Sequence, residues 1–226
     1  MKPPLWYPGK PVQHARMDIG RILHSDDCMS EGAHWLARRE PRFAEALALC
    51  GPPPLRRRAD GFAALMGAIV SQQVSVASAR AILARMEGAG LTTPEAIAAA
   101  DDDAMRAGGL SRQKIRYIRA LAGAGIDFDA LRHAPDTQVI EQLIVIPGIG
   151  RWTAEIYAMF SLGRADVFAP NDLALQEAAR VLFDLPERPR EAALRRMAED
   201  WSPWRTVAAG LLWAYYHVAK QREGVV

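Results

Sequence analysis

Hydrophobic residues recur at helical spacing along most of the chain, and no run of β-branched residues alternates with polar residues over the length of a strand. This pattern predicts an all-α fold. The opening segment, residues 1–28, is rich in proline and has no period, so we expect an N-terminal arm there and a first helix near Ser30.

Proline, glycine and capping residues divide the periodic region into helices. Pro41 should separate two short helices, and the proline run at residues 51–54 should be extended. Asp60 and Ser75 are predicted N-caps on either side of a polar interruption at residues 71–74. Similar signals predict a helix after Thr93, the end of another before Gly108-Gly109, and helices over residues 112–124, 137–146, 173–183 and 204–220.

A chain of 226 residues with half its positions apolar can bury a core of one or two compact units. Cys28 and Cys50 are too few for a disulfide framework, a four-thiolate zinc site or an iron–sulfur cluster. No stretch is apolar over the roughly 18 residues that a membrane span needs. We therefore expect a soluble, cytoplasmic protein with no membrane partner. Because the net charge is only +2, contacts to DNA would have to come from local arginine clusters.

The segment Ile146-Pro147-Gly148-Ile149-Gly150 has the composition of a hairpin between two helices. Pro147 stops the preceding helix, and the two glycines permit a tight turn before the next helix begins. Backbone N–H groups at such a helix start, with no bulky side chain in the way, can bind one nucleic-acid phosphate. A plain connection between two helices, with glycine needed only for the turn, is the alternative.

Three motifs in this order resemble the helix-hairpin-helix superfamily of DNA glycosylases: the hairpin, Asp172 at its spacing from Trp152, and residues 200–205. The likeness covers residues 30–220 and is greatest to the 3-methyladenine DNA glycosylase II branch, in a compact form without a separate N-terminal β-domain. It implies two helical lobes with a DNA-binding cleft between them. Lobe A would comprise about 29–55 and 165–226, and lobe B about 56–164.

Asp172 is the catalytic carboxylate that the resemblance implies. Cleavage of an N-glycosidic bond develops positive charge on the sugar, and a nearby carboxylate stabilises that charge and can orient or deprotonate the attacking water. Asp172 by itself also fits the N-cap of a following helix, and one residue can fill both roles. Relatives that nick the strand carry a lysine where this chain has Trp152, so the reaction should stop at the abasic site.

Alkylated purines such as 3-methyladenine are cationic and electron-poor, so aromatic faces bind them better than they bind normal bases. Trp152 and Trp204 are the predicted walls of the base pocket, although both also fit an ordinary core stripe. Tyr157 and Trp213 are assigned to the core. The polar interruption places Gln73 where the family has its intercalating wedge, with leucine in the best-known members; a surface glutamine between two helices is the alternative.

The resemblance also implies contacts to the DNA backbone and one bound ion. In the family, backbone carbonyls of the hairpin hold a monovalent cation. A second helix start in the family also contacts DNA; the alternative for that helix is an ordinary capped helix with a solvated basic face. The implied phosphate contacts are Gly148, Gly150 and Thr153 at the hairpin and Ser111 with Lys114 at the second helix; the implied cation ligands are the carbonyls of Ile144, Ile146 and Ile149.

Together these inferences predict a monofunctional glycosylase that flips alkylated bases out of double-stranded DNA and hydrolyses their N-glycosidic bond, which would start base excision repair at the nucleoid. Apart from potassium or sodium at the hairpin, no cofactor and no obligate protein partner are expected, and a monomer suits a protein that scans DNA. Two alternatives stay open: a damaged-DNA-binding protein without chemistry, and a glycosylase for oxidised or mismatched bases.

Overall fold

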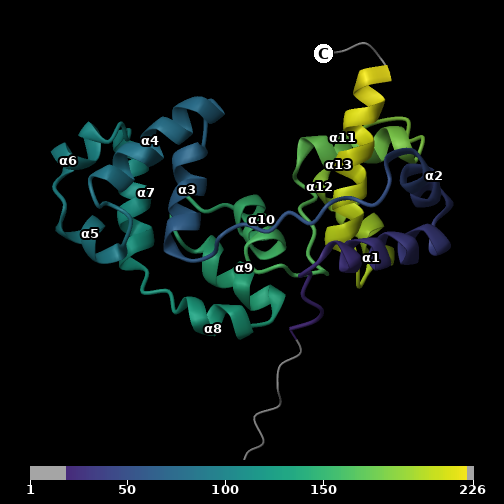
Figure 1. The fold of residues 1–226 in the computed structure, drawn as a ribbon, viewed down its shortest axis with the longest axis horizontal. Helices are drawn as coiled ribbons and strands as arrows, with labels where there is room; N and C mark the ends of the chain where they lie inside the picture. Colours follow the sequence, from purple (N-terminus) through teal and green to yellow (C-terminus); the bar gives the residue numbers. More distant parts are fainter. Residues whose placement is uncertain (1–18, 223–226) are drawn as a thin grey trace, which may run out of the picture.

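The computed structural model describes residues 19–222, and within that range the chain is helical without a β-strand (Figure 1). The all-α prediction is therefore confirmed. Most of the predicted N-terminal arm lies outside the described residues. The first helix begins at Asp26, where Ser25 accepts a hydrogen bond from the Cys28 amide, so the predicted start near Ser30 is too late.

Helices from the two ends of the chain pack together on one side of the molecule (Figure 1). The last helix, α13 (Arg205–Arg222), packs against the first two helices and against α11 (Leu173–Leu182), so α13 is the central element of this group. Its members are α1 Asp26–Arg39, α2 Pro41–Cys50, α11 Leu173–Leu182, α12 Glu191–Met197, the 3₁₀ helix η1 Ala198–Trp201 and α13 Arg205–Arg222.

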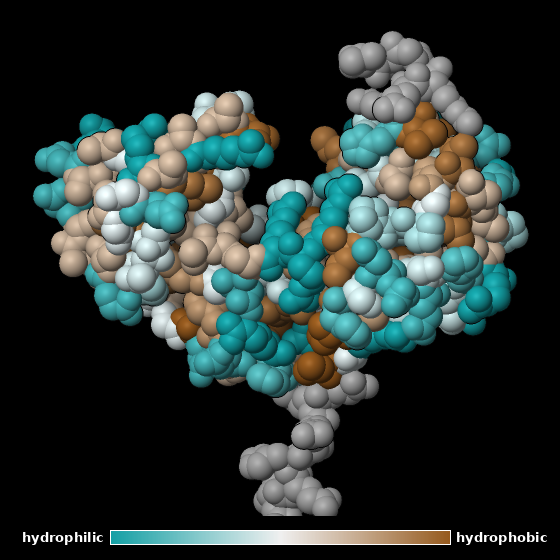
Figure 2. Space-filling view, in the orientation of Figure 1, coloured by the Kyte–Doolittle hydropathy of each residue, from teal (hydrophilic) through white to brown (hydrophobic). Residues whose placement is uncertain are grey.

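The middle of the chain forms a second group of helices on the other side (Figure 1). Here α7 is the central element, because α3, α5 and α6 all pack against it, while α9 packs against α10. The members are α3 Phe62–Ser71, α4 Val76–Gly88, α5 Pro94–Ala99, α6 Asp102–Ala107, α7 Arg112–Gly123, α8 Phe128–His133, α9 Asp136–Ile144 and α10 Arg151–Phe160. The surface is hollowed between the two groups (Figure 2).

Short backbone contacts join the segments that cross between the groups. The Leu23 amide donates to the carbonyl of Gly163 at 2.7 Å, and the Arg58 amide donates to that of Phe160 at 3.0 Å. Arg164, whose side chain is 1% exposed, donates to the Ile19 carbonyl at 2.8 Å and so holds the described start of the chain at this crossing. The terminal nitrogens of Arg164 thus find backbone partners where the two groups meet, while its buried Nε has no hydrogen-bond partner among the described residues.

Most helix boundaries follow the capping signals of the sequence. Pro41 begins α2, and Ser75 and Thr93 cap α4 and α5 with their hydroxyl groups, as predicted. The prediction for Asp60 is wrong, because Gly61 is the N-cap of α3 and Asp60 instead forms an ion pair with Arg132 at 2.6 Å. No helix within residues 19–222 combines the length and the apolar character needed to cross a bilayer.

Candidate active site

The hairpin between α9 and α10 has an open helix start. The turn passes through Gly148 at φ +94°, where a Cβ atom would lie 2.4 Å from Cγ of Tyr117, so only glycine fits. Gly150 is the N-cap of α10, and no side chain caps this helix. A Cβ at Gly150 would meet nothing within 4 Å, so there is open space beside this helix start. This geometry suits an anion with several oxygen acceptors.

A fixed loop brings Asp172 to the start of α11. The buried side chain of Gln176 donates to the carbonyl of Pro170 at 2.9 Å, and the Asp172 amide donates to that of Ala169 at 3.0 Å. The hydroxyl of Thr206, on α13, lies 2.8 Å from the Val167 carbonyl. The loop that carries the carboxylate is therefore held by two different helices.

The Asp172 carboxylate accepts four hydrogen bonds. Oδ1 accepts from the amides of Ala174 at 3.0 Å and Leu175 at 3.1 Å, which confirms the N-cap interpretation. Oδ1 also accepts from the indole Nε1 of Trp213 at 3.2 Å, and Oδ2 accepts from Nε1 of Trp152 at 3.1 Å. Among the described residues Oδ2 thus has one protein donor where Oδ1 has three, which leaves Oδ2 the oxygen with room for a further partner.

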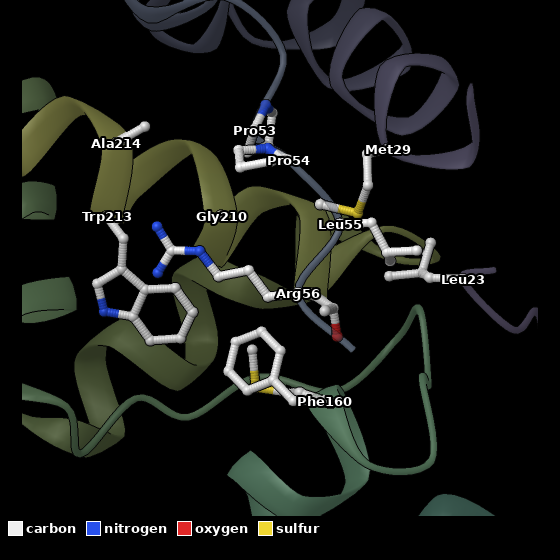
Figure 3. A pocket seen from close by; sticks show the side chains of 12 residues that line it. Leu23, Met29, Pro53, Pro54, Leu55, Arg56, Phe160, Gly210, Trp213 and Ala214 are labelled. Carbon is white, nitrogen blue, oxygen red and sulfur yellow. The ribbon is translucent and has the colours of Figure 1, made fainter. Parts of the chain in front are cut away.

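Trp213 is held in place by the ring of Phe160. The two ring centroids are 5.7 Å apart with an interplanar angle of 35°. Figure 3 shows both rings beside Arg56, at a small cavity of about 30 Å³ that the extended segment 53–56 covers. Because Phe160 ends α10 and Trp213 belongs to α13, this contact joins the two helix groups next to Asp172.

A larger pocket of about 400 Å³ opens beside the carboxylate, between α3 and α10. Trp152, Ile156 and Tyr157 from α10 line it together with small and aliphatic residues of α3. Trp152 is 42% exposed, which is unusual for a tryptophan of a globular core. The side chain whose indole contacts Asp172 is therefore also a wall of this pocket, in agreement with the interpretation of Trp152 as a pocket residue.

Trp204 does not take part in this pocket, and the prediction that it forms a second wall is wrong. Its ring is 4% exposed and lies so close to α1 that a Cβ on Gly32 would come within 2.6 Å of it. The guanidinium of Arg21 covers the ring at 4.5 Å from its centroid. Trp204 therefore packs α13 against α1, as the core alternative proposed.

The predicted wedge lies on an exposed loop between α3 and α4. Gln73 has φ +58°, a left-handed conformation that non-glycine residues rarely adopt. The partly buried Lys114 lies beside this loop, and its ammonium donates to the carbonyl of Val70 at 2.6 Å. Two N–H groups of the ammonium are left for other partners, so the phosphate contact through this side chain stays a prediction. Ser111 caps α7, as the alternative interpretation of that helix start expected.

The carbonyls implied for a cation lie at the end of α9 and in the turn. Ile144 is the last residue of α9, so its carbonyl is among those that a helix end leaves without an intrahelical partner. The carbonyl of Ile146 accepts from the Ile149 amide at 3.0 Å, which uses one of its two lone pairs. Carbonyl oxygens at a helix C-terminus favour positive charge, so the Ile144 carbonyl suits a cation, and ligation by all three carbonyls stays a prediction.

Sequence reasoning did not find the contacts that two core residues make at the site. Tyr157 is 4% exposed and lies in the core, as predicted, but it also lines the pocket, and its hydroxyl accepts from the Gly61 amide at 2.9 Å. Trp213, also predicted for the core, donates to the Asp172 carboxylate. Nothing local to either residue indicates this, since both have the spacing of buried residues on their helices. Their partners come from elements far away in the sequence.

Comparisons with known proteins point to one family. The model of the HhH-GPD superfamily, base excision DNA repair proteins, matches residues 66–203. The "DNA-3-methyladenine glycosylase 1" of Schizosaccharomyces pombe is 35% identical over 158 residues, which cover 66% of this chain and 69% of that protein.

Solved structures agree with the sequence comparison. The crystal structure of a DNA-3-methyladenine glycosidase from Bacillus halodurans superposes with a TM-score of 0.78 at 35% identity, covering 88% of this chain and 94% of that one. The Schizosaccharomyces pombe 3-methyladenine DNA glycosylase in complex with abasic DNA has a TM-score of 0.70 at 31% identity, with 81% of this chain and 95% of that one covered.

Proposed function

The chain belongs to the HhH-GPD superfamily of base excision DNA repair proteins, and we propose that it is a monofunctional glycosylase that hydrolyses the N-glycosidic bond of alkylated bases in duplex DNA. The observation that carries the proposal is the Asp172 carboxylate, whose less occupied oxygen lies 3.1 Å from the indole that lines the pocket. A flipped base in that pocket would bring its sugar to the carboxylate.

Asp172 would act on the sugar and on water. As the bond to the base breaks, positive charge develops on the sugar, and the negative Asp172 stabilises it at short range. The same oxygen can orient the attacking water or accept its proton. The donors on Oδ1 hold the carboxylate in a fixed direction, so that little reorganisation is needed during the reaction.

The pocket has the character that an alkylated base requires. Methylation of a purine ring nitrogen gives a cationic base, which the face of Trp152 would attract more strongly than a neutral one. Apolar residues of α3 and α10 also line the pocket, together with polar residues that include Arg58 and Gln72. Extraction of the base costs a few kcal/mol of stacking and pairing, and Gln73 on its exposed loop would fill the gap that the base leaves.

The hairpin would bind the DNA backbone next to the lesion. Its open amides at the start of α10 supply donors for one phosphate without reading sequence. We further propose a potassium or sodium ion at the hairpin carbonyls, where it would add positive charge near that phosphate. Hydrolysis rather than strand nicking is proposed because Trp152 offers no amine for a Schiff base with the sugar.

Base release from duplex DNA that carries 3-methyladenine tests the proposal. Asp172→Asn should slow release at least about a hundredfold, because the charge that stabilises the sugar is lost, while binding to the damaged duplex persists. Asp101→Asn is the matched control, since Asp101 also caps a helix through its carboxylate but lies away from the pocket. This variant should release base at the wild-type rate.

The same assay separates the proposal from its alternatives. Free base with intact strands, seen with the wild type and not with Asp172→Asn, is the expected result. Binding without release from any alkylated substrate would favour a damaged-DNA-binding protein. Strand nicking with a borohydride-trapped adduct would instead indicate a glycosylase with lyase activity.

A further inference from the structure

The loop between α3 and α4 is fixed at several points around the exposed Gln73. At its start, the carbonyl of Val70 accepts the Lys114 ammonium at 2.6 Å, and at its end Ser75 caps α4. Gln73 stands between these points with φ +58°. A residue in such a conformation persists only where its surroundings determine it.

One of these contacts ties the loop directly to the hairpin. The side-chain Nε2 of Gln72 donates to the carbonyl of Gly148 at 2.9 Å, across 76 positions of sequence. Gln72 immediately precedes the exposed Gln73, and Gly148 lies two residues before Gly150, where the open amides of α10 begin. A single hydrogen bond therefore links the loop tip to the turn.

The Gly148 peptide is enclosed on more than one side. The ring of Tyr117 on α7 fills the space where a Cβ would be, and the Tyr117 hydroxyl accepts from Gln113 at 2.7 Å. With Gln72 on its carbonyl, this peptide group is restrained by the loop and by α7 together. Rotation of the peptide would move the turn that leads to the open amides.

We propose that Gln72 is a positioning residue that couples the wedge loop to the phosphate-binding hairpin through the carbonyl of Gly148. DNA bound at the hairpin then lies at a fixed distance from Gln73, so that insertion of Gln73 into the gap depends on the backbone contact at the hairpin. Gln72 also lines the base pocket, and a contact to the base alone would slow release equally whether or not a base pair has to be broken. The inference rests on the proposed glycosylase function and deepens it.

The test removes the amide of Gln72 while keeping the length of the side chain. Gln72→Met removes the donor without adding charge, and Gln142→Met on the exposed face of α9 is the matched control. Single-turnover base release is measured on two duplexes with the same 3-methyladenine, one with thymine opposite the lesion and one with an abasic site there. Opposite the abasic site no base pair has to be broken, so the wedge contributes less.

Gln72→Met should slow release about three- to tenfold on the paired duplex, the effect of one net hydrogen bond, and less than twofold opposite the abasic site. Gln142→Met should match the wild type on both, and thermal unfolding should be unchanged for both variants within a few degrees. Equal slowing on both duplexes, or no slowing on either, would overturn the coupling role. If the wild type itself releases no base from either duplex, the proposed function fails instead.

Discussion

At the scale of single residues, the Asp172 carboxylate combines a local role with distant ones. Its backbone donors come from the first turn of its own helix, as an N-cap requires. Its indole donors come from Trp152 on α10 and Trp213 on α13. A residue that looks like an ordinary cap is therefore also the point where three helices meet at the pocket.

Removal of one indole donor should slow the reaction while leaving the fold intact. Trp213→Phe keeps an aromatic ring against Phe160 but loses the N–H on Oδ1, so we expect base release to fall about three- to tenfold through kcat. The control is Trp35→Phe, which changes a tryptophan that stacks with Arg39 on α1. A wild-type kcat for Trp213→Phe would show that its N–H does not orient the carboxylate.

At the scale of elements, the close contact between α1 and α13 depends on a glycine that lies opposite a tryptophan. Gly32 on α1 faces the ring of Trp204, and the Val207 side chain approaches the same point. The absence of a side chain at Gly32 allows α1 and α13 to approach closely and bury the ring between them. The core position of Trp204 thus follows from the pairing of two helices at opposite ends of the chain.

A methyl group at this contact should destabilise the protein. Gly32→Ala would place a Cβ 2.6 Å from Trp204, and such overpacking costs about 1–3 kcal/mol of unfolding free energy. Gly88→Ala on α4 meets nothing within 4 Å and should instead stabilise by about 0.5–1 kcal/mol, because alanine favours the helix. Urea denaturation of both variants measures the change in unfolding free energy, which should be negative for Gly32→Ala and positive for Gly88→Ala. Changes of the same sign would contradict the prediction.

At the scale of the whole molecule, an ion pair crosses between the two helix groups on a face lined by α9, α10 and α12. Glu155 of α10 is buried and accepts from Arg195 of α12 at 2.9 Å, and beside this pair Arg205 of α13 contacts Asp166 at 2.7 Å. Burial raises the pKa of Glu155 above its ordinary value of 4.5, against the opposing effect of Arg195. Ionisation of Glu155 in the folded protein therefore lowers the free energy of unfolding.

This cost predicts a pH-dependent effect of Glu155→Gln. A carboxyl with a raised folded-state pKa contributes stability that is present below pH 4.5 and is lost as pH rises through the folded-state value. Glutamine does not ionise, so the stability of the variant relative to the wild type should increase from pH 4.5 to pH 7.5. Urea denaturation at both pH values measures this difference. A difference that stays constant or falls with pH would contradict the role of burial.

The sequence by itself determined the features that depend on neighbouring residues. Helical periodicity predicted the all-α fold, Ser75 and Thr93 predicted helix starts, and the glycines at 148 and 150 predicted the turn between α9 and α10. Each follows from backbone sterics or from a hydrogen bond within a few residues, which the local sequence encodes completely. Asp172 as an N-cap belongs to the same class.

Only the tertiary structure decided which side chains meet at the candidate site. Trp152 and Trp204 both fit a core stripe in the sequence, yet one lines the pocket and the other packs against α1, because different elements surround them. Trp213 reaches Asp172, and Lys114 donates to the carbonyl of Val70, for the same reason. Burial and hydrogen-bond partners are set by elements far apart in the chain, and hydrophobic spacing along a single helix carries no information about them.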